Sequence, residues 1–207
     1  FQVGERIGIG ATTLENIQTH LQKVYAGHVG IEYKYISDQN KVNWLAEEME
    51  KNFTKPVPLA TKKRILEKIN QGVMFEKFLH TKYVGQKRFS LEGGETTIPA
   101  LDAIINKSAF LGVKEVVIGM AHRGRLNILA NIMGKTYEQI FSEFEGTGKV
   151  DQTMGSGDVK YHMGFGSEIE TPEGKTIHLK LMPNPSHLEA VDPVVLGFAR
   201  SAANILH

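Results

Sequence analysis

A histidine and two arginines stand within four positions of the chain, where a buried strand is expected to give way to a helix. His122, Arg123 and Arg125 follow the β-branched run 116–118 and open a pattern of helical spacing. At such a junction a helix N-terminus presents unpaired N–H groups that favour anions, and the planar guanidinium fork suits phosphate or carboxylate. The pattern predicts an anion site; the alternative is that one arginine pairs with a neighbouring carboxylate.

Two further histidines, His162 and His187, stand at comparable loop positions. Histidine can act as a cation for carboxylates, carry protons near neutral pH or bind a metal. Each of the three alone is explained by an ordinary surface or hydrogen-bonded histidine, whereas the three together favour a shared site. A zinc triad is a further alternative, but the short histidine spacings of zinc sites are absent from the sequence.

The composition is that of an ordinary soluble domain, with 207 residues of which 41% are hydrophobic and 23% charged. The net charge of +1 divides into +5 for residues 1–90 and −4 for residues 91–207. Without basic blocks or aromatic interleaving, the positive half favours a solvated surface over nucleic-acid binding. The absence of cysteine excludes disulfides and thiolate metal sites, and no apolar run approaches the ~20 residues of a membrane span. Because the sequence begins at Phe1 and stops within a helical pattern, we expect it to be part of a longer protein.

Hydrophobic spacing predicts three helices in the first half and an α/β arrangement in the second. The helices are expected at 11–27, with a threonine as candidate N-cap, from Asp38 onward, with Asp38 as the cap, and at 61–81 with an interruption near Gly72. Helix, buried strand, glycine turn and helix in this order indicate an α/β fold with a parallel sheet covered on both faces. The helices expected in the second half lie at 96–111, at 125–133, from 136, where Thr136 and Gln139 form a capping box, and from 192. The other elements expected there are a strand at 116–118, a glycine-rich mobile loop at 146–157, and a hairpin at 164–181 that turns at 172–174.

Four motifs, in order, resemble those of the thiamine diphosphate-dependent first, decarboxylating component of the 2-oxoglutarate dehydrogenase complex. They are Lys87-Arg-Phe-Ser-Leu-Glu-Gly93, Gly119-Met-Ala-His-Arg-Gly-Arg-Leu-Asn127, Gly157-Asp-Val-Lys-Tyr-His-Met-Gly164 and Asn184-Pro-Ser-His-Leu-Glu-Ala-Val-Asp-Pro193. The stretch Tyr25-Ala-Gly-His-Val-Gly-Ile-Glu-Tyr33 also resembles the helical region of that family, so the resemblance covers nearly the whole chain.

The resemblance implies a helical N-terminal domain, residues 1–86, followed by residues 87–207 as part of a thiamine diphosphate-binding α/β domain truncated before its magnesium motif. It implies an enzyme that decarboxylates 2-oxoglutarate oxidatively and passes the succinyl group to a lipoyl group on a partner succinyltransferase subunit. It also implies thiamine diphosphate and Mg²⁺ as cofactors, and a homodimer with the cofactor between two subunits. The implied location is the bacterial cytoplasm or, in a eukaryote, the mitochondrial matrix.

Carried over residue by residue, the resemblance also names a site. The residues that would contact thiamine diphosphate are Arg123, Ser186, His187 and Leu188. The catalytic residues would be His122 and His162, which together with Ser186 would hold the substrate carboxylates. Phe89 would line the substrate channel.

The sequence departs from the family pattern at two points, and these departures limit which functional roles can be assigned to its residues. Gly166 stands where many members have a polar residue, so no side-chain contact is expected there. The Gly-Asp turn and later asparagine that hold magnesium in the family are absent, and Gly157-Asp158 belongs to a different motif. No residue of this chain is therefore expected to bind the metal, whose ligands are expected beyond residue 207. The chain alone is expected to bind thiamine diphosphate weakly or not at all.

Two alternatives remain open. A related enzyme that acts on 2-oxoadipate shares these motifs, and the one additional methylene is worth only ~1–3 kcal/mol of discrimination. The chain could also be a non-catalytic interaction module whose basic helical half docks a partner, because a fold alone does not establish a function.

Overall fold

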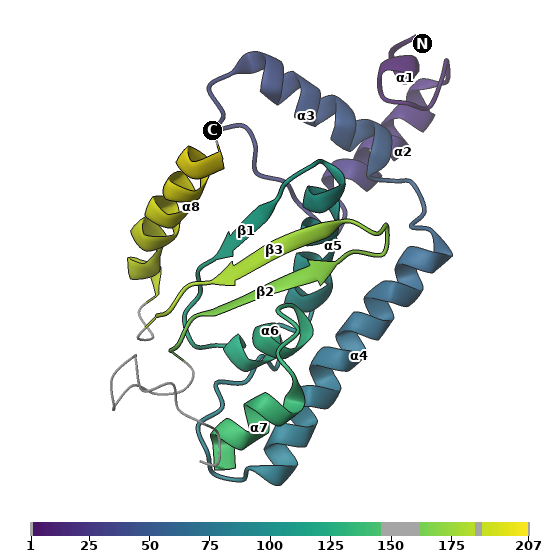
Figure 1. Ribbon diagram of the computed structural model, residues 1–207. Coiled ribbons are helices and arrows are strands. Elements are labelled where there is room, and N and C mark those ends of the chain that lie inside the picture. Colours follow the sequence, from purple (N-terminus) through teal and green to yellow (C-terminus); the bar gives the residue numbers. More distant parts are fainter. Residues whose placement is uncertain (1, 146–161, 185–187, 207) are drawn as a thin grey trace. The chain divides into compact units, whose positions relative to one another are not determined.

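The computed structural model describes residues 2–145, 162–184 and 188–206 (Figure 1). The chain divides into two compact units, Phe1–Leu59 and Ala60–His207. The expected glycine-rich loop at 146–157 lies outside the described residues, as do Ser186 and His187. The expected domain boundary at residue 86 concerns the family's domains rather than these compact units, and it stays a prediction.

The first unit contains the helices α1 (Val3–Arg6), α2 (Leu14–Tyr25) and α3 (Gln39–Asn52). As predicted, α2 and α3 begin after capping side chains: Thr13 accepts a hydrogen bond from the main-chain N–H of Asn16, and Asp38 accepts from those of Asn40 and Lys41. The two helices pack through their apolar faces. The buried residues of this small core are Val24, Tyr33, Val42 and Met49.

The second unit begins with α4 (Leu59–Lys82), which is one continuous helix. The predicted interruption near Gly72 is wrong. A Cβ at Gly72 would lie 3.4 Å from Cγ1 of Ile98 and 3.6 Å from Oδ1 of Asn127, and the Gly72 carbonyl accepts a hydrogen bond from Asn127 Nδ2 at 3.0 Å. Close packing and this bond offset the ~1 kcal/mol by which glycine disfavours a helix interior.

Four more helices follow: α5 (Thr97–Phe110), α6 (Arg125–Asn131), α7 (Tyr137–Glu145) and α8 (Asp192–Leu206), the last preceded by a 3-10 turn, Glu189–Val191. The helices α6 and α7 are joined through Gly134, with φ 71°. The predicted capping box is confirmed at α7, where Thr136 and Gln139 exchange two hydrogen bonds between side chain and main chain. Across the part of the chain that the structure describes, no helix has both the length and the apolar composition needed to cross a bilayer.

Three strands form one mixed sheet in the order β1 (Glu115–Ile118), β3 (Thr176–Leu181), β2 (Phe165–Glu170). The expectation of an α/β arrangement is confirmed, but only β1 and β3 run parallel. Strand β2 is antiparallel to β3 and forms with it the predicted hairpin, which turns at Gly174 with φ 70°.

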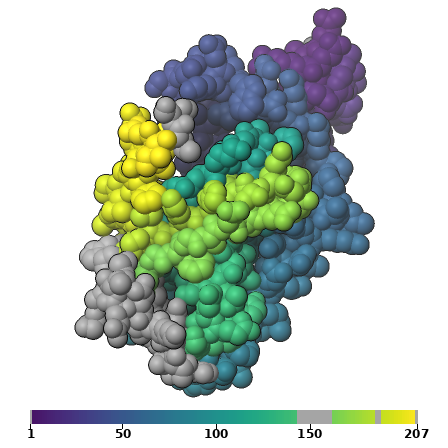
Figure 2. Space-filling view, in the orientation of Figure 1, coloured from purple at the N-terminus to yellow at the C-terminus, as the bar shows by residue number. Residues whose placement is uncertain are grey.

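One face of the sheet supplies the core of this unit. In β3 the side chains of Ile177, Leu179 and Leu181 are buried and pack with residues of α5 and α6, which lie behind the sheet in Figure 1. The alternate residues Glu168 and His178 are exposed, and this outer face of β2 and β3 is visible in Figure 2. The expectation that both faces are covered is therefore not met for these two strands within the described residues; α8 lies beside β1.

Candidate anion site at the end of the sheet

Three loops that carry candidate residues meet at one end of the sheet. The strand register pairs Leu181 both with Ile118 of β1 and with Phe165 of β2. The chain therefore leaves β1 and β3 and enters β2 at the same end, and the carboxyl ends of parallel strands are where ligands bind in α/β sheets. His122 lies in the loop after β1, and His162 lies in the approach to β2.

Arg125, the first residue of α6, binds all three of these segments. It is 1% exposed, its Nη2 donates to the carbonyls of Met163 and Met182 at 2.8 Å each, and its Nη1 donates to that of Met120 at 3.3 Å. Burial lowers the pKa of Arg125 to about 10, which leaves the guanidinium charged at neutral pH. The terminal nitrogens of Arg125 are thus directed at main-chain carbonyls, whereas its buried Nε has no hydrogen-bond partner within the described residues. A part for Arg125 in the anion site stays a prediction.

Asn184 joins the same segments by a second route. Its buried amide Nδ2 donates to the carbonyl of Met120, and its main-chain N–H donates to the carbonyl of His162, both at 2.9 Å. The main-chain N–H of Met182 also bonds to the carbonyl of Ile118 at 2.9 Å, which extends the parallel pairing by one residue. The backbone around both candidate histidines is thus held at the end of the sheet.

The ring of His122 packs against the ring of Phe89, with centroids 4.2 Å apart. The carbonyl of Phe89 accepts a hydrogen bond at 2.7 Å from the N–H of Gly124, which joins the 88–92 segment to the loop after β1. Within the described residues, the buried Nδ1 of His122 has no hydrogen-bond partner. An unsatisfied buried polar atom costs roughly 1–3 kcal/mol, so His122 is suited to bind a group that these residues do not supply.

The side chain of Arg123 lies on the surface, directly after His122. Its Nη2 donates to the carbonyl of Glu92 at 2.9 Å. This neutral partner orients the guanidinium without neutralising its charge, so Arg123 retains the property that a phosphate or carboxylate site requires. Of the two arginines in the motif, Arg123 is the one whose setting fits the predicted anion site.

A buried carboxylate in α4 anchors the segment that carries Phe89, and the sequence analysis missed it. Glu76 is 3% exposed, and it accepts hydrogen bonds at 3.0 Å from Arg88 Nη1, from the main-chain N–H of Leu91 and from Asn127 Nδ2. A carboxylate beside Phe75 on the apolar face of a helix is the sequence feature that could have revealed it. Arg88 and Asn127 both belong to the motifs that carry the family resemblance, and their hydrogen bonds to Glu76 give each of them a structural role.

The remaining candidates are only partly described. His162 is half-buried and its carbonyl is bound by Asn184. Leu188 is 75% exposed immediately before the 3-10 turn. Ser186 and His187 lie outside the described residues, so the roles given to them, and the catalytic and binding roles given to the others, stay predictions.

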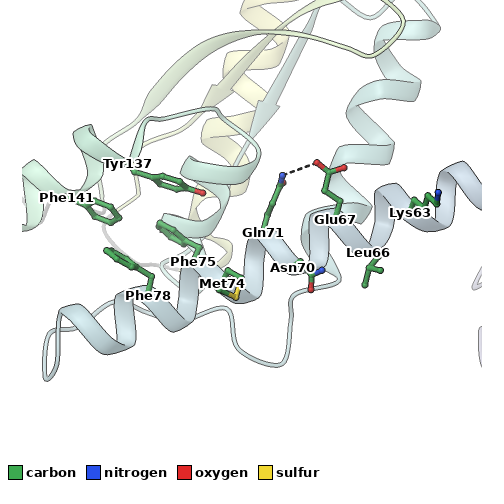
Figure 3. A pocket seen from close by; sticks show the side chains of 10 residues that line it. All are labelled: Lys63, Leu66, Glu67, Asn70, Gln71, Met74, Phe75, Phe78, Tyr137 and Phe141. Atoms are coloured by element: carbon green, nitrogen blue, oxygen red, sulfur yellow. Dashed lines mark hydrogen bonds between the residues drawn. The ribbon is translucent and has the colours of Figure 1, made fainter.

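An apolar groove between α4 and α7, with a volume of about 770 Å³, contains none of the candidate residues (Figure 3). Aromatic rings pack on its wall: those of Phe75 and Tyr137 stack with centroids 5.6 Å apart, and those of Phe78 and Phe141 are tilted with centroids 5.0 Å apart. Its lining is too apolar to neutralise a diphosphate or a dicarboxylate. The residues that line it are Lys63, Leu66, Glu67, Asn70, Gln71, Met74, Phe75, Phe78, Tyr137 and Phe141.

The described residues contain no group of three or more His, Cys, Asp or Glu side chains that could hold a metal ion. The expectation that the magnesium ligands lie elsewhere is not tested by this observation and stays a prediction.

Comparison with known proteins finds relatives along nearly the whole chain, although no family model matches it. The chain is 51% identical over 207 residues to the "Multifunctional 2-oxoglutarate metabolism enzyme" of Mycolicibacterium vanbaalenii, which covers 100% of this chain and 17% of that protein. It is 49% identical over 195 residues to the "2-oxoglutarate dehydrogenase E1 component" of Cupriavidus necator, covering 94% of this chain and 20% of that protein. It is 43% identical over 196 residues to the "2-oxoglutarate dehydrogenase, mitochondrial" of Saccharomyces cerevisiae, covering 95% of this chain and 19% of that protein.

The chain therefore spans only about a fifth of the length of the curated relatives it matches. The alignment with the first of these relatives nevertheless covers 100% of this chain and so spans the positions of all four motifs. The resemblance predicted from the motifs is confirmed: along its length, the chain matches one segment of the 2-oxoglutarate dehydrogenase first components.

Proposed function

We propose that the chain is part of an enzyme that decarboxylates 2-oxoglutarate oxidatively and transfers the succinyl group to a lipoyl group. The observation that carries this proposal is the identity of 43–51%, along nearly the whole chain, with proteins whose names specify 2-oxoglutarate metabolism or its dehydrogenase. The chain alone would supply one part of the site, since it spans about a fifth of those relatives.

The arrangement at the end of the sheet fits an anionic cofactor and a dicarboxylate substrate. Arg123 offers an exposed positive charge that is oriented by Glu92, and His122 has a buried Nδ1 without a partner among the described residues. Thiamine diphosphate would supply the electron sink needed for loss of carbon dioxide from a 2-oxo acid. The chain would bind and orient the reactants and balance their charge.

Each candidate residue has a part in this proposal. Arg123, with the segment from Ser186 to Leu188, would bind thiamine diphosphate. His122 and His162 would hold the carboxylates of 2-oxoglutarate as donors or cations, and Phe89 would exclude water where its ring covers His122. The finer assignment of residues 87–207 to a thiamine diphosphate-binding domain belongs to the same proposal.

The remaining components are proposed from the family resemblance. They are Mg²⁺ held by residues outside this chain, a lipoyl-bearing succinyltransferase subunit as acceptor, and a homodimer with the cofactor between subunits. The setting would be the bacterial cytoplasm or the mitochondrial matrix; the relatives include bacterial proteins and one named as mitochondrial. Calorimetry on the 207-residue chain with Mg²⁺ tests the expectation that it binds thiamine diphosphate weakly.

The test of the function is an assay of the longer protein that carries this chain. Purified with thiamine diphosphate and Mg²⁺, it should release carbon dioxide from 2-oxoglutarate when an artificial electron acceptor is present. A higher kcat/KM for 2-oxoadipate would instead favour the related enzyme, since both acids share the charges that the site would recognise. No turnover of either acid, in a protein that binds another macromolecule, would support the non-catalytic alternative and overturn the proposal.

A further inference from the structure

Arg125 carries a full charge into the core, where it is 1% exposed. Its three hydrogen bonds go to the carbonyls of Met120, Met163 and Met182, which come from the three segments at the end of the sheet. Burying an arginine is costly unless its donors are satisfied, and the buried Nε of Arg125 has no partner within the described residues. The placement therefore requires an explanation beyond the packing of α6.

The three carbonyls are close in sequence to the predicted substrate residues. Met120 precedes His122 by two positions, and Met163 directly follows His162. One guanidinium thus joins the backbone of both histidines, because Nη1 binds the first segment and Nη2 binds the second. A change in this fork would act on both segments without removing either histidine.

We propose that Arg125 is a positioning residue, which sets the separation of His122 and His162 and thereby the length of dicarboxylate that the two histidines can hold. This inference rests on the proposed function, because it gives the histidines their part in holding the substrate. Arginine suits this role because the two terminal nitrogens of its planar fork are fixed relative to each other, whereas the ammonium of lysine is a single point. Arg125→Lys keeps a positive side chain and loses the fork.

The first arm of the experiment needs no catalysis. Amide hydrogen exchange of the longer protein should rise in Arg125→Lys for the segments 119–124 and 182–184, where the N–H groups of Met182 and Asn184 bond across the sheet end. Exchange in α5 and in the middle of β3 should not change. A uniform rise across the unit would mean that Arg125 only stabilises the fold, and no rise would mean that it does not hold these segments; either result overturns the proposal.

The second arm is a double-mutant cycle on the kinetics with 2-oxoglutarate. We expect Arg125→Lys to lower kcat/KM by roughly 10- to 100-fold, as small misplacements of substrate-binding groups do. In a His162→Ala background the same change should cost only a few-fold, since the group to be positioned is gone. Equal losses in both backgrounds would overturn the positioning role.

Two further variants keep the result interpretable. Arg64→Lys is the matched control: Arg64 binds Asp102 through Nε and Nη2 at 2.6 and 2.8 Å, away from the sheet end, so its effect on kinetics should be the same with or without His162. If Arg125→Lys does not fold, Asn184→Ser removes the side-chain bond to the carbonyl of Met120, and it should loosen the same segments to a smaller degree. A wild-type protein without activity on 2-oxoglutarate would count against the proposed function, whereas the exchange arm would still decide whether Arg125 holds the segments.

Discussion

Phe89 and His122 lie with their ring centroids 4.2 Å apart, and Phe89 holds this place with a φ of 46°. This left-handed conformation costs a non-glycine residue roughly 1–2 kcal/mol. Such strain persists where surrounding contacts determine the conformation. Here the ring contact and the hydrogen bond from the N–H of Gly124 to the Phe89 carbonyl are those contacts.

The strain at residue 89 can be separated from the loss of its ring. We expect Phe89→Ala to be less stable than Phe89→Gly by about 1 kcal/mol, because both variants lose the ring but only glycine adopts a positive φ without penalty. Chemical denaturation followed by circular dichroism measures the difference. An alanine variant as stable as the glycine variant would show that this backbone conformation is not retained without the ring.

Gly124 forms the other side of the same contact, and we expect Gly124→Ala to be strongly destabilising. Its φ of 74° disfavours any side chain, and a Cβ would lie 2.5 Å from Cδ1 of Leu91. Strain and overlap together should cost about 2–4 kcal/mol in the free energy of unfolding. The control is Gly134→Ala, with a φ of 71° and nothing within 4 Å of the added methyl, which should cost only about 1 kcal/mol. Equal effects of the two substitutions would contradict the predicted overlap.

Local features of the sequence predict most of the helices and the hairpin. Thr13, Asp38 and Thr136 can be recognised as caps because an N-cap side chain bonds to main-chain N–H groups two or three positions along the chain, and each is confirmed. The interruption at Gly72 is wrong because the reason for that glycine, the approach of Ile98 and Asn127, comes from residues 26 and more positions away. The mixed sheet order, too, depends on which strands meet, and no local pattern contains that information.

The same distinction applies to the candidate site. The position of His122 and Arg123 after a strand can be predicted, because strand and helix patterns are local. The different roles of Arg123 and Arg125 cannot, since both are arginines in one loop and only the fold shows that Arg125 is directed at carbonyls from residues 163 and 182. The structure therefore adds to the motif the buried contacts between segments that are far apart in the sequence.

The Glu76 contact is expected to be among the costliest in the unit to disrupt. Glu76→Gln removes the charge that faces Arg88. If the amide oxygen takes the place of Oε1, which accepts hydrogen bonds from Leu91 and Asn127, the N–H₂ group takes the place of Oε2 and faces the guanidinium of Arg88, donor against donor. We expect a loss of about 3 kcal/mol in the free energy of unfolding, as for other broken buried pairs. The measurement is denaturant unfolding.

The matched control for Glu76 is Glu168→Gln. Glu168 pairs with His178 at 3.4 Å on the outer face of the sheet, where both side chains are more than half exposed. Solvent screens such a pair, so its loss should cost under about 1 kcal/mol. If the two substitutions prove equally mild, the buried carboxylate does not anchor the 88–92 segment.

His162→Ala separates substrate binding from cofactor binding in the longer protein. Because the backbone on either side of this residue is held by Asn184 and by Arg125 at Met163, loss of the imidazole should leave the surrounding loops in place. We expect kcat/KM for 2-oxoglutarate to fall by about 100-fold, the scale of a lost charge-bearing or proton-carrying group. The dissociation constant of thiamine diphosphate, titrated with Mg²⁺ present, should change little, since other residues are predicted to contact the cofactor.

His178→Ala, at an exposed histidine on the outer face of β3, serves as control and should alter neither quantity. Equal losses of substrate turnover and cofactor affinity in His162→Ala would contradict the substrate role and place this side chain with the cofactor instead.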